Sequence, residues 1–102
     1  MDYIKEIYEI LLKHKGEGNE ISSAKIAKLI GINEDDTHPN TRSLIEDTMK
    51  QYEIPIGSNT KGYFIIQSKQ ELDKYIRNLD ARIKGIEERK NNVKKFFQKG
   101  VK

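Results

Sequence analysis

The chain has 102 residues, a length that predicts one domain with room for an appended segment, and its lack of cysteine excludes disulfides and thiolate metal sites. No apolar run approaches the roughly 18 residues of a membrane span. The net charge of +3 is unevenly divided, since residues 1–67 carry 8 Lys and Arg against 11 Asp and Glu, or −3, and residues 68–102 carry 11 against 5, or +6.

The first predicted helix covers residues 2–14, where apolar side chains recur at helical spacing before glycines at positions 16 and 18 end it. Its stripe consists of Tyr3, Ile4, Ile7, Tyr8 and Leu11. The same residues include Asp2 and Glu6 and lack the pattern of a signal peptide, so we expect a cytoplasmic protein.

A very short strand is predicted at residues 20–21, and a second helix follows it. Ser22 or Ser23 can cap this helix, because a serine oxygen accepts a hydrogen bond from a free first-turn N–H, and Gly31 is a natural end. The residues expected to face inward are Ile26, Leu29 and Ile30.

After a polar loop, Pro39 is expected to begin a third helix, because the missing N–H of proline costs nothing in a first turn. The predicted buried stripe of this helix is Leu44, Ile45, Met49 and Tyr52. The residues expected to face outward are then Asn40, Thr41, Arg42, Ser43, Glu46, Asp47 and Lys50.

Residues 54–65 form two β-prone runs around a polar turn at residues 58–61, which predicts a hairpin. Pro55 in the first run cannot donate to a ladder, so the first strand should be an edge. The second strand, residues 63–67, should lie in the middle and pair with the short strand near residue 21. The order helix, short strand, helix, helix, hairpin is that of a winged helix-turn-helix, in which the hairpin is the wing.

One long helix is predicted from Ser68 onward. Ser68 and Glu71 form a capping-box pattern, in which each side chain accepts a hydrogen bond from a backbone N–H near the other. Apolar residues then alternate at spacings of four and three, with Lys90 in the one polar slot. This heptad stripe consists of Leu72, Ile76, Leu79, Ile83, Ile86, Val93 and Phe97.

About thirty residues of helix reach about 45 Å, which a small winged module cannot cover. The stripe therefore predicts pairing with a second chain, and the alternative is a tail that folds back on the winged module, with Gly85 permitting a bend. The surplus of basic residues in the tail either forms an ordinary solvated face or attracts DNA phosphates or an acidic partner. Its members are Lys84, Arg89, Lys90, Lys94, Lys95, Lys99 and Lys102.

The segments "ISSAKIAKLIGI" and "TRSLIEDTMKQYEIPIGSNTKGYFI" resemble small winged helix-turn-helix proteins of bacteriophages and prophages. The resemblance covers roughly residues 20–90, and the wing, residues 54–64, is its most specific part. It implies a mainly α fold with a small β-hairpin, followed by a helical tail, and a DNA-binding role. The link at residues 31–38 is longer and more acidic than a tight helix-turn-helix turn, and it should place Glu34, Asp35 and Asp36 close to the recognition helix.

In such a fold the third helix reads bases in the major groove, where Arg42 can make a forked contact to guanine and Asn40 one to adenine. The wing tip suits phosphate or minor-groove contact. The alternative is an ordinary solvated face and a hairpin tip without a partner. The candidate DNA-contacting residues are Asn40, Thr41, Arg42, Ser43, Lys50, Asn59, Thr60 and Lys61.

Other chemistry is not indicated. His14 and His38 have no ligand-spaced partner, and the acidic run at residues 34–36 lacks the glycine and distal glutamate of a calcium loop. The sequence contains neither a nucleophile elbow nor a phosphate loop. We therefore expect no enzymatic activity, metal, cofactor or small-molecule ligand.

The first hypothesis is a non-enzymatic, sequence-specific double-stranded DNA-binding protein of phage or mobile-element type. A winged helix-turn-helix domain would cover residues 1–67, and a C-terminal helix, residues 68–102, would form a homodimer. Transcriptional regulation is the simplest use, and a replication or packaging role is equally compatible.

The second hypothesis is a protein-interaction module without DNA binding, which uses the acidic face of the winged domain for docking and the tail for oligomerisation. The charge of −3 over residues 1–67 favours this alternative, because DNA phosphates are negative.

Overall fold

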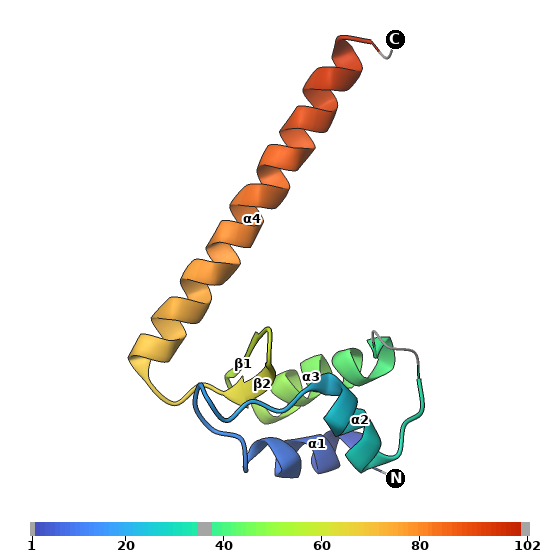
Figure 1. The fold of residues 1–102 in the computed structure, drawn as a ribbon, viewed down its shortest axis with the longest axis vertical. Coiled ribbons are helices and arrows are strands. Elements are labelled where there is room, and N and C mark those ends of the chain that lie inside the picture. The colour runs from blue at the N-terminus through green and yellow to red at the C-terminus, as the bar shows by residue number, and fades with distance from the viewer. Residues whose placement is uncertain (1, 35–37, 101–102) are drawn as a thin grey trace. The chain divides into compact units, whose positions relative to one another are not determined.

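The computed structural model describes residues 2–34 and 38–100. The elements are, in order, α1 (Tyr3–Leu11), α2 (Ser23–Ile30), α3 (Pro39–Tyr52), β1 (Ile56–Asn59), β2 (Gly62–Ile65) and α4 (Lys69–Gln98), as Figure 1 shows. The chain divides into two compact units, Met1–Leu72, called the N-terminal unit below, and Asp73–Lys102. The predicted combination of a mainly helical chain, one hairpin and a long C-terminal helix is confirmed.

Helix α1 begins where the Asp2 carboxylate accepts a hydrogen bond from the Lys5 N–H at 3.1 Å. It ends three residues earlier than the predicted residue 14, because the following backbone pairs with the end of β2. The Ile65 N–H donates to the His14 carbonyl at 2.9 Å, and the Gly16 N–H donates to the Ile65 carbonyl at 2.8 Å. Sheet pairing therefore replaces the last turn of the predicted helix.

Helix α2 has the predicted ends. The Ser22 hydroxyl accepts from the Lys25 N–H at 3.1 Å, and Gly31 closes the helix in a left-handed conformation. The prediction that Leu29 faces inward is wrong, since its side chain is 59% exposed, and Ala27 is buried instead. The buried stripe runs through Ile26, Ala27 and Ile30, and it leaves Leu29 on the flank of the helix.

Helix α3 starts at Pro39 as predicted, and Ile45 is buried in its middle. Its other predicted apolar residues are partly buried, and the Tyr52 ring stacks on the Tyr8 ring of α1 with centroids 4.0 Å apart. Thr48 is also fully buried, and its hydroxyl donates to the Leu44 carbonyl at 2.7 Å. The α1–α3 contact therefore combines apolar packing with internally satisfied threonines.

The hairpin is antiparallel, with a register from Ile56 opposite Ile65 to Asn59 opposite Gly62. Its turn is therefore only two residues, 60 and 61, which is shorter than predicted. On the other side of β2, Ile21 and Tyr63 exchange two backbone hydrogen bonds, of 2.9 and 2.8 Å. The predicted pairing of the second strand with residue 21 is confirmed, but only as a single bridge at Ile21: the short strand predicted at residues 20–21 does not form, and the sheet consists of β1 and β2.

The core of the N-terminal unit is built mainly from isoleucine, and every element before α4 contributes to it or to its neighbours. Its buried members are Ile7, Leu11, Ile21, Ile26, Ile30, Ile45, Ile56 and Ile65. Half-buried residues such as Tyr3, Met49 and Tyr63 pack around this cluster. The core lies entirely in residues 7–65, so its packing does not use the side chains of α4.

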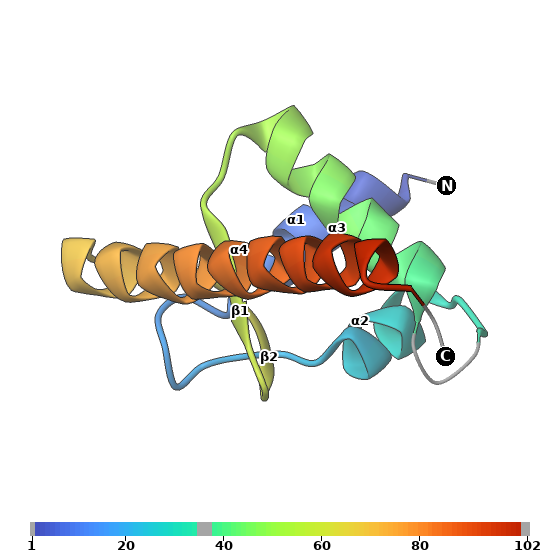
Figure 2. The same cartoon turned by 90° about the horizontal axis from the view of Figure 1, so that it is seen from above.

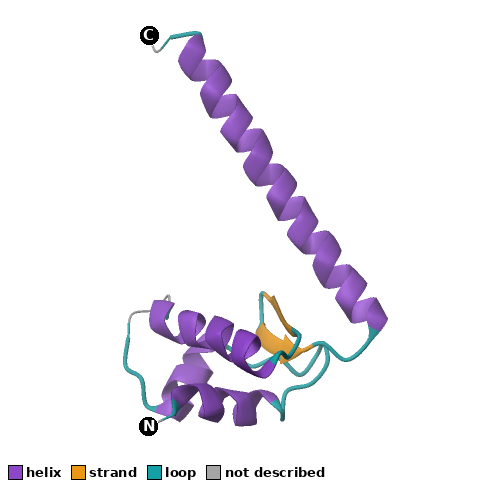
Figure 3. Cartoon of the chain, turned by 180° about the vertical axis from the view of Figure 1, so that it is seen from behind, coloured by secondary structure: helices purple, strands orange, loops and turns teal. Residues whose placement is uncertain are grey.

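Helix α4 is continuous from Lys69 to Gln98, through Gly85, and it is drawn as one unbroken helix in Figure 3. The predicted capping box forms: the Glu71 N–H donates to the Ser68 hydroxyl at 3.1 Å, and the Gln67 N–H donates to the Glu71 carboxylate at 2.8 Å. The same carboxylate also accepts from the Glu17 N–H at 2.8 Å. The first turn of α4 is thereby joined to the loop after α1. None of the residues of α4 is buried.

Candidate nucleic-acid interface

One face of the N-terminal unit is formed by α3 and the hairpin tip. In Figure 1, α1 lies on one side of α3, and the hairpin tip extends toward the other side; in the view from above, α1 lies behind α3 (Figure 2). The face of α3 that is turned away from the core exposes most of the predicted contact residues. These are Asn40, Arg42, Ser43 and Lys50, together with Glu46 and Asp47.

The prediction that Thr41 faces outward is wrong, because its side chain is 0% exposed. Its N–H donates to the Glu34 carboxylate at 2.9 Å, and its hydroxyl donates to the same group. The spacing of Thr41, Ile45, Thr48 and Tyr52 is that of a single helix face, so the buried stripe begins one turn earlier than the apolar residues indicate. Thr41 therefore holds α3 in place and is closed to a partner.

Glu34 caps α3 from the preceding link, because its carboxylate also accepts from the Asn40 N–H at 2.8 Å. Burial raises the pKa of Glu34, but the hydrogen bonds from the Thr41 hydroxyl and from both N–H groups outweigh it, so the pKa is lowered. The expected position of Glu34 beside α3 is confirmed, and Asp35 and Asp36 lie outside the described residues. A fixed negative charge thus occupies the helix end where a phosphate would otherwise find free donors.

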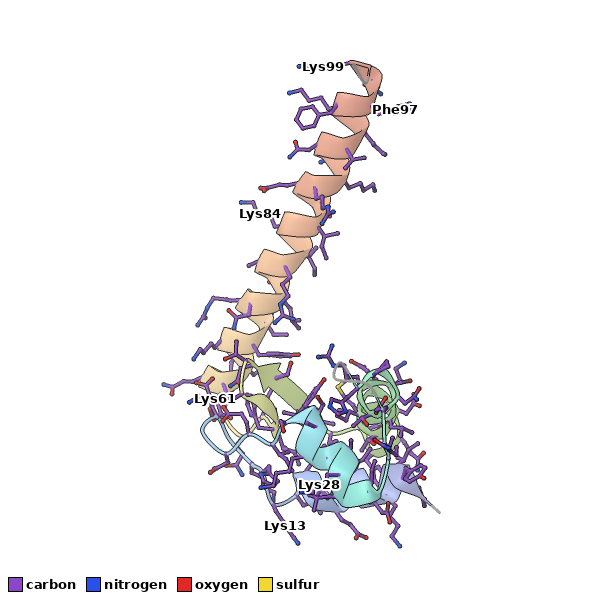
Figure 4. The ribbon with its side chains drawn as sticks, turned by 45° about the vertical axis from the view of Figure 1, so that its right-hand side comes forward. Lys13, Lys28, Lys61, Lys84, Phe97 and Lys99 are labelled. Atoms are coloured by element: carbon purple, nitrogen blue, oxygen red, sulfur yellow. The ribbon has the colours of Figure 1, made fainter. Side chains whose placement is uncertain are left out.

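The hairpin tip is tied to the segment before α2. The Asn59 amide nitrogen donates to the Glu20 carboxylate at 2.6 Å, and the Asn59 side-chain oxygen accepts from the Lys61 N–H at 2.9 Å. The side-chain hydrogen bond from Asn59, assisted by the N–H of Gly18, lowers the pKa of Glu20 to about 2. Both ends of the Asn59 amide therefore support the turn, and Thr60 and Lys61 are its exposed residues (Figure 4).

Neither Glu34 nor Glu20 was identified in this role from the sequence. Glu34 reaches an N-terminus that begins several residues later, and Glu20 meets a side chain 39 positions away. Local capping patterns detect only neighbours within about one turn. The sequence offers a clue for Glu34 alone, because histidine, which stands at position 38 before Pro39, is not a preferred N-cap residue. In the structure, His38 makes no side-chain cap hydrogen bond.

The charges on this face nearly cancel. Arg42, Lys50 and Lys61 are positive, and Glu46 and Asp47 lie on the same face of α3. The fixed carboxylates of Glu34 and Glu20 add two negative charges at the helix start and the hairpin tip. A partner would therefore be bound through individual side chains, because general attraction to a polyanion needs a basic surplus.

Acid should destabilise the N-terminal unit, because Glu20, Glu34 and Glu71 all have lowered pKa values in the folded chain. The unfolded chain takes up protons near the ordinary value of 4.5, whereas folded Glu20 does so only near about 2. The contribution is therefore complete above about pH 4.5 and is lost as the pH falls toward 2. We expect the urea midpoint, followed by near-ultraviolet circular dichroism of the tyrosines, to fall across this window.

The variant Glu20→Gln should flatten that pH dependence, because it removes the titrating group with the largest shift. Glu9→Gln, which removes an exposed carboxylate of α1, is the matched control. Equal pH slopes in the two variants would show that the hydrogen bonds at the hairpin tip do not contribute to stability in this way.

Helix α4 carries a second candidate surface, the seam formed by the predicted heptad residues. Leu79 is partly buried, and the others are exposed, from 39% at Leu72 to 76% at Phe97. Phe96, which was not predicted, is 58% exposed beside the seam. Residues 89–99 carry five Lys and Arg and no acidic residue, and Figure 4 shows Phe97 and Lys99 at this end of the helix.

The described residues give little support for other kinds of functional site. Residues 2–34 and 38–100 contain no group of three or more His, Asp or Glu placed to hold a metal ion. Among the described helices, none combines the length and apolar character that a membrane crossing requires. Comparison with protein-family models, curated proteins and solved structures gives no match to the chain. Its function must be inferred from its own residues.

Proposed function

We propose that this chain is a non-enzymatic, sequence-specific double-stranded DNA-binding protein with a winged helix-turn-helix N-terminal unit, which acts as a homodimer through α4. The carrying observation is the arrangement of α3 and the hairpin: the exposed side of α3 faces the side toward which the hairpin tip extends. Strand β2 holds this hairpin by pairing with β1 and, through a single bridge, with Ile21. A helix and a ribbon on one face suit a major groove and the adjacent backbone.

Within this proposal, the base-reading residues lie near the start of α3. Arg42 offers a forked donor to guanine, and Asn40 offers an amide to adenine. Ser43 and Lys50 contact the backbone along α3, and Thr60 and Lys61 do so from the wing tip. Thr41 leaves this set because it is buried, and Asn59 acts through the shape of the turn.

Arg42→Ala should weaken binding to a duplex selected from a random pool by about 5- to 150-fold, which corresponds to ~1–3 kcal/mol, and should relax specificity at one position. Lys61→Ala should instead weaken all sequences about equally and reduce the salt slope by about 1, because it contacts phosphate. Lys13→Ala is the control, since Lys13 follows α1 and lies away from the hairpin tip (Figure 4). The measurement is a titration of labelled duplex at two salt concentrations.

If neither Arg42→Ala nor Lys61→Ala differs from Lys13→Ala, the assignment of the interface is wrong. Transcriptional regulation in a phage or mobile element is the simplest use of such binding, and replication or packaging is equally compatible. The choice between them depends on the duplex that the protein selects.

A protein-interaction module is the second candidate function, favoured by the negative charges fixed at Glu34 and Glu20. Two carboxylates held at the ends of the same face suit a basic protein surface better than a phosphate backbone. If the wild-type chain binds no duplex even at low salt, this candidate replaces DNA binding.

A further inference from the structure

The flanks of the α4 seam carry an ordered pattern of charge. Spacings of four and three place Ile76, Ile83, Lys90 and Phe97 at heptad positions a, and Leu72, Leu79, Ile86 and Val93 at positions d. The e positions beside them are Asp73, Asp80, Glu87 and Lys94. The g positions are Tyr75, Arg82, Arg89 and Phe96. The central flanks of α4 are thus acidic on the e side and basic on the g side.

We propose that two copies of α4 pair in parallel and in register, so that Arg82 of each copy faces Glu87 of the other. This inference rests on the homodimer of the proposed function and specifies how it is built. In a parallel pair, a g residue lies next to the e residue of the following heptad in the second copy. By symmetry the Arg82–Glu87 attraction forms twice, near the middle of the helix, while Arg89 and Lys94, which are both positive, repel each other twice closer to its end.

An antiparallel pair would bring like charges together, because g residues then face g residues and e residues face e residues. The two alignments that keep most of the seam covered put Ile83 opposite Leu79 or opposite Ile86. In the first, Arg82 faces Arg82 and Asp80 faces Asp80; in the second, Arg82 faces Arg89 and Asp80 faces Glu87. The second alignment also brings Asp73 next to Lys94. This attraction does not offset the four repulsive contacts, since the Arg82–Arg89 and Asp80–Glu87 contacts each occur twice.

Lys90 supports the same arrangement for an independent reason. In a parallel pair in register, the two Lys90 side chains share one a layer, and their long stems can carry both charges to solvent. In either antiparallel alignment, each Lys90 lies opposite an apolar residue, Leu72 or Leu79, so two layers are interrupted. A parallel pair that slips by one heptad likewise interrupts two layers. Only the parallel pair in register confines both Lys90 side chains to one layer, so Lys90 favours both this orientation and this register of the two helices.

The consequence for the proposed function is geometric. A parallel pair joins both N-terminal units to the same end of the paired helices, so that two α3 helices are available to two half-sites of one duplex. An antiparallel pair would attach them at opposite ends of a helix about 45 Å long.

The native chain has no cysteine, so a single introduced thiol reports orientation directly. In the parallel pair the two thiols of Val93→Cys face each other at a d layer, within disulfide reach. In the antiparallel alignments they lie at least about 25 Å apart along the helix. We expect the full-length Val93→Cys protein to form a disulfide-linked dimer on mild oxidation. Glu88→Cys, at an outward f position, is the control that should not cross-link.

Charge reversal at Arg82 weakens only the parallel pair. Arg82→Glu should raise the dimer dissociation constant by roughly 5- to 30-fold in a parallel pair, because two attractions become repulsions. The double variant Arg82→Glu with Glu87→Arg should restore it, and Lys84→Glu, at an outward b position, should leave it nearly unchanged. In an antiparallel pair, Arg82→Glu would not weaken the dimer, because it exchanges one like-charge contact for another where Arg82 faces Arg82 and creates an attraction where Arg82 faces Arg89.

Sedimentation equilibrium on the same samples distinguishes the existence of the homodimer from the parallel arrangement of its helices. A wild-type dimer with the Val93→Cys disulfide and a weakened Arg82→Glu variant supports parallel pairing. A wild-type dimer in which Val93→Cys does not cross-link, or in which Arg82→Glu does not weaken association, overturns the parallel arrangement and leaves the homodimer intact. A wild-type monomer at tens of micromolar overturns both.

Discussion

Replacing Leu79 and Ile83 together by aspartate is expected to convert the proposed dimer to a monomer. These residues lie at the centre of the seam, and the Ile83 side chain is 55% exposed in the single chain, so pairing has apolar surface to remove from water. At about 25 cal/mol per Å², burying these side chains in both copies supplies several kcal/mol, and in the variant four buried carboxylates, two from each copy, oppose pairing further. The dissociation constant should rise at least about a thousandfold.

Sedimentation equilibrium should give about twice the chain mass of 11.9 kDa for the wild type and the single mass for the variant. Asn78→Asp with Ala81→Asp is the matched control, because it adds the same two charges to the same turns at outward c and f positions. The near-ultraviolet dichroism of the Tyr8–Tyr52 pair should be unchanged throughout, since the core of the N-terminal unit does not use α4. A dimeric Leu79→Asp, Ile83→Asp variant would show that the interface lies elsewhere, and a monomeric wild type would favour a tail that folds back.

Gly62→Ala should destabilise the N-terminal unit by about 3 kcal/mol or more. Gly62 has a φ of +142°, and an added Cβ would lie 2.3 Å from the Ile21 carbonyl oxygen and 2.8 Å from the Ser22 nitrogen. These are backbone atoms that cannot turn aside, so the pairing of Ile21 with Tyr63 must open. Urea unfolding, followed by near-ultraviolet dichroism, measures the loss.

Gly18→Ala is the control that separates the cost of backbone strain from the cost of a steric clash. Gly18 also has a positive φ, +104°, but its added Cβ would meet nothing within 4 Å. Its expected cost is about 1 kcal/mol, from backbone conformation alone. Equal losses in the two variants would show that the close approach of β2 to Ile21 is relieved by a small shift. The proposed pairing of α4 should survive both substitutions.

The sequence predicted the elements well where one local rule governs them. Ser22 and Ser68 identify helix starts, and Pro55 identifies the edge strand, because each acts on its own backbone neighbourhood. It failed where a contact depends on distant partners. Leu29 has the spacing of a core residue but lies on a flank, and the end of α1 is set by pairing with β2.

The candidate interface was predicted less completely for the same reason. The outward positions of Arg42 and Lys50 follow from the apolar residues of α3. The burial of Thr41 could not be predicted in this way, because threonine is a polar residue type. Only the structure shows that the Glu34 carboxylate accepts a hydrogen bond from its hydroxyl. The Glu20–Asn59 hydrogen bond joins residues with no regular spacing, so only the folded chain reveals it.

The Glu71 carboxylate, which accepts from both Gln67 and Glu17, has a consequence for how the long helix forms. Starting an isolated helix is unfavourable, because several residues must be ordered before the first hydrogen bond forms. Here the folded N-terminal unit holds the first turn of α4 in place, so nucleation is already complete at that end. Growth then proceeds in one direction, toward Gln98, and two copies that meet near their nucleated ends can zip together from there.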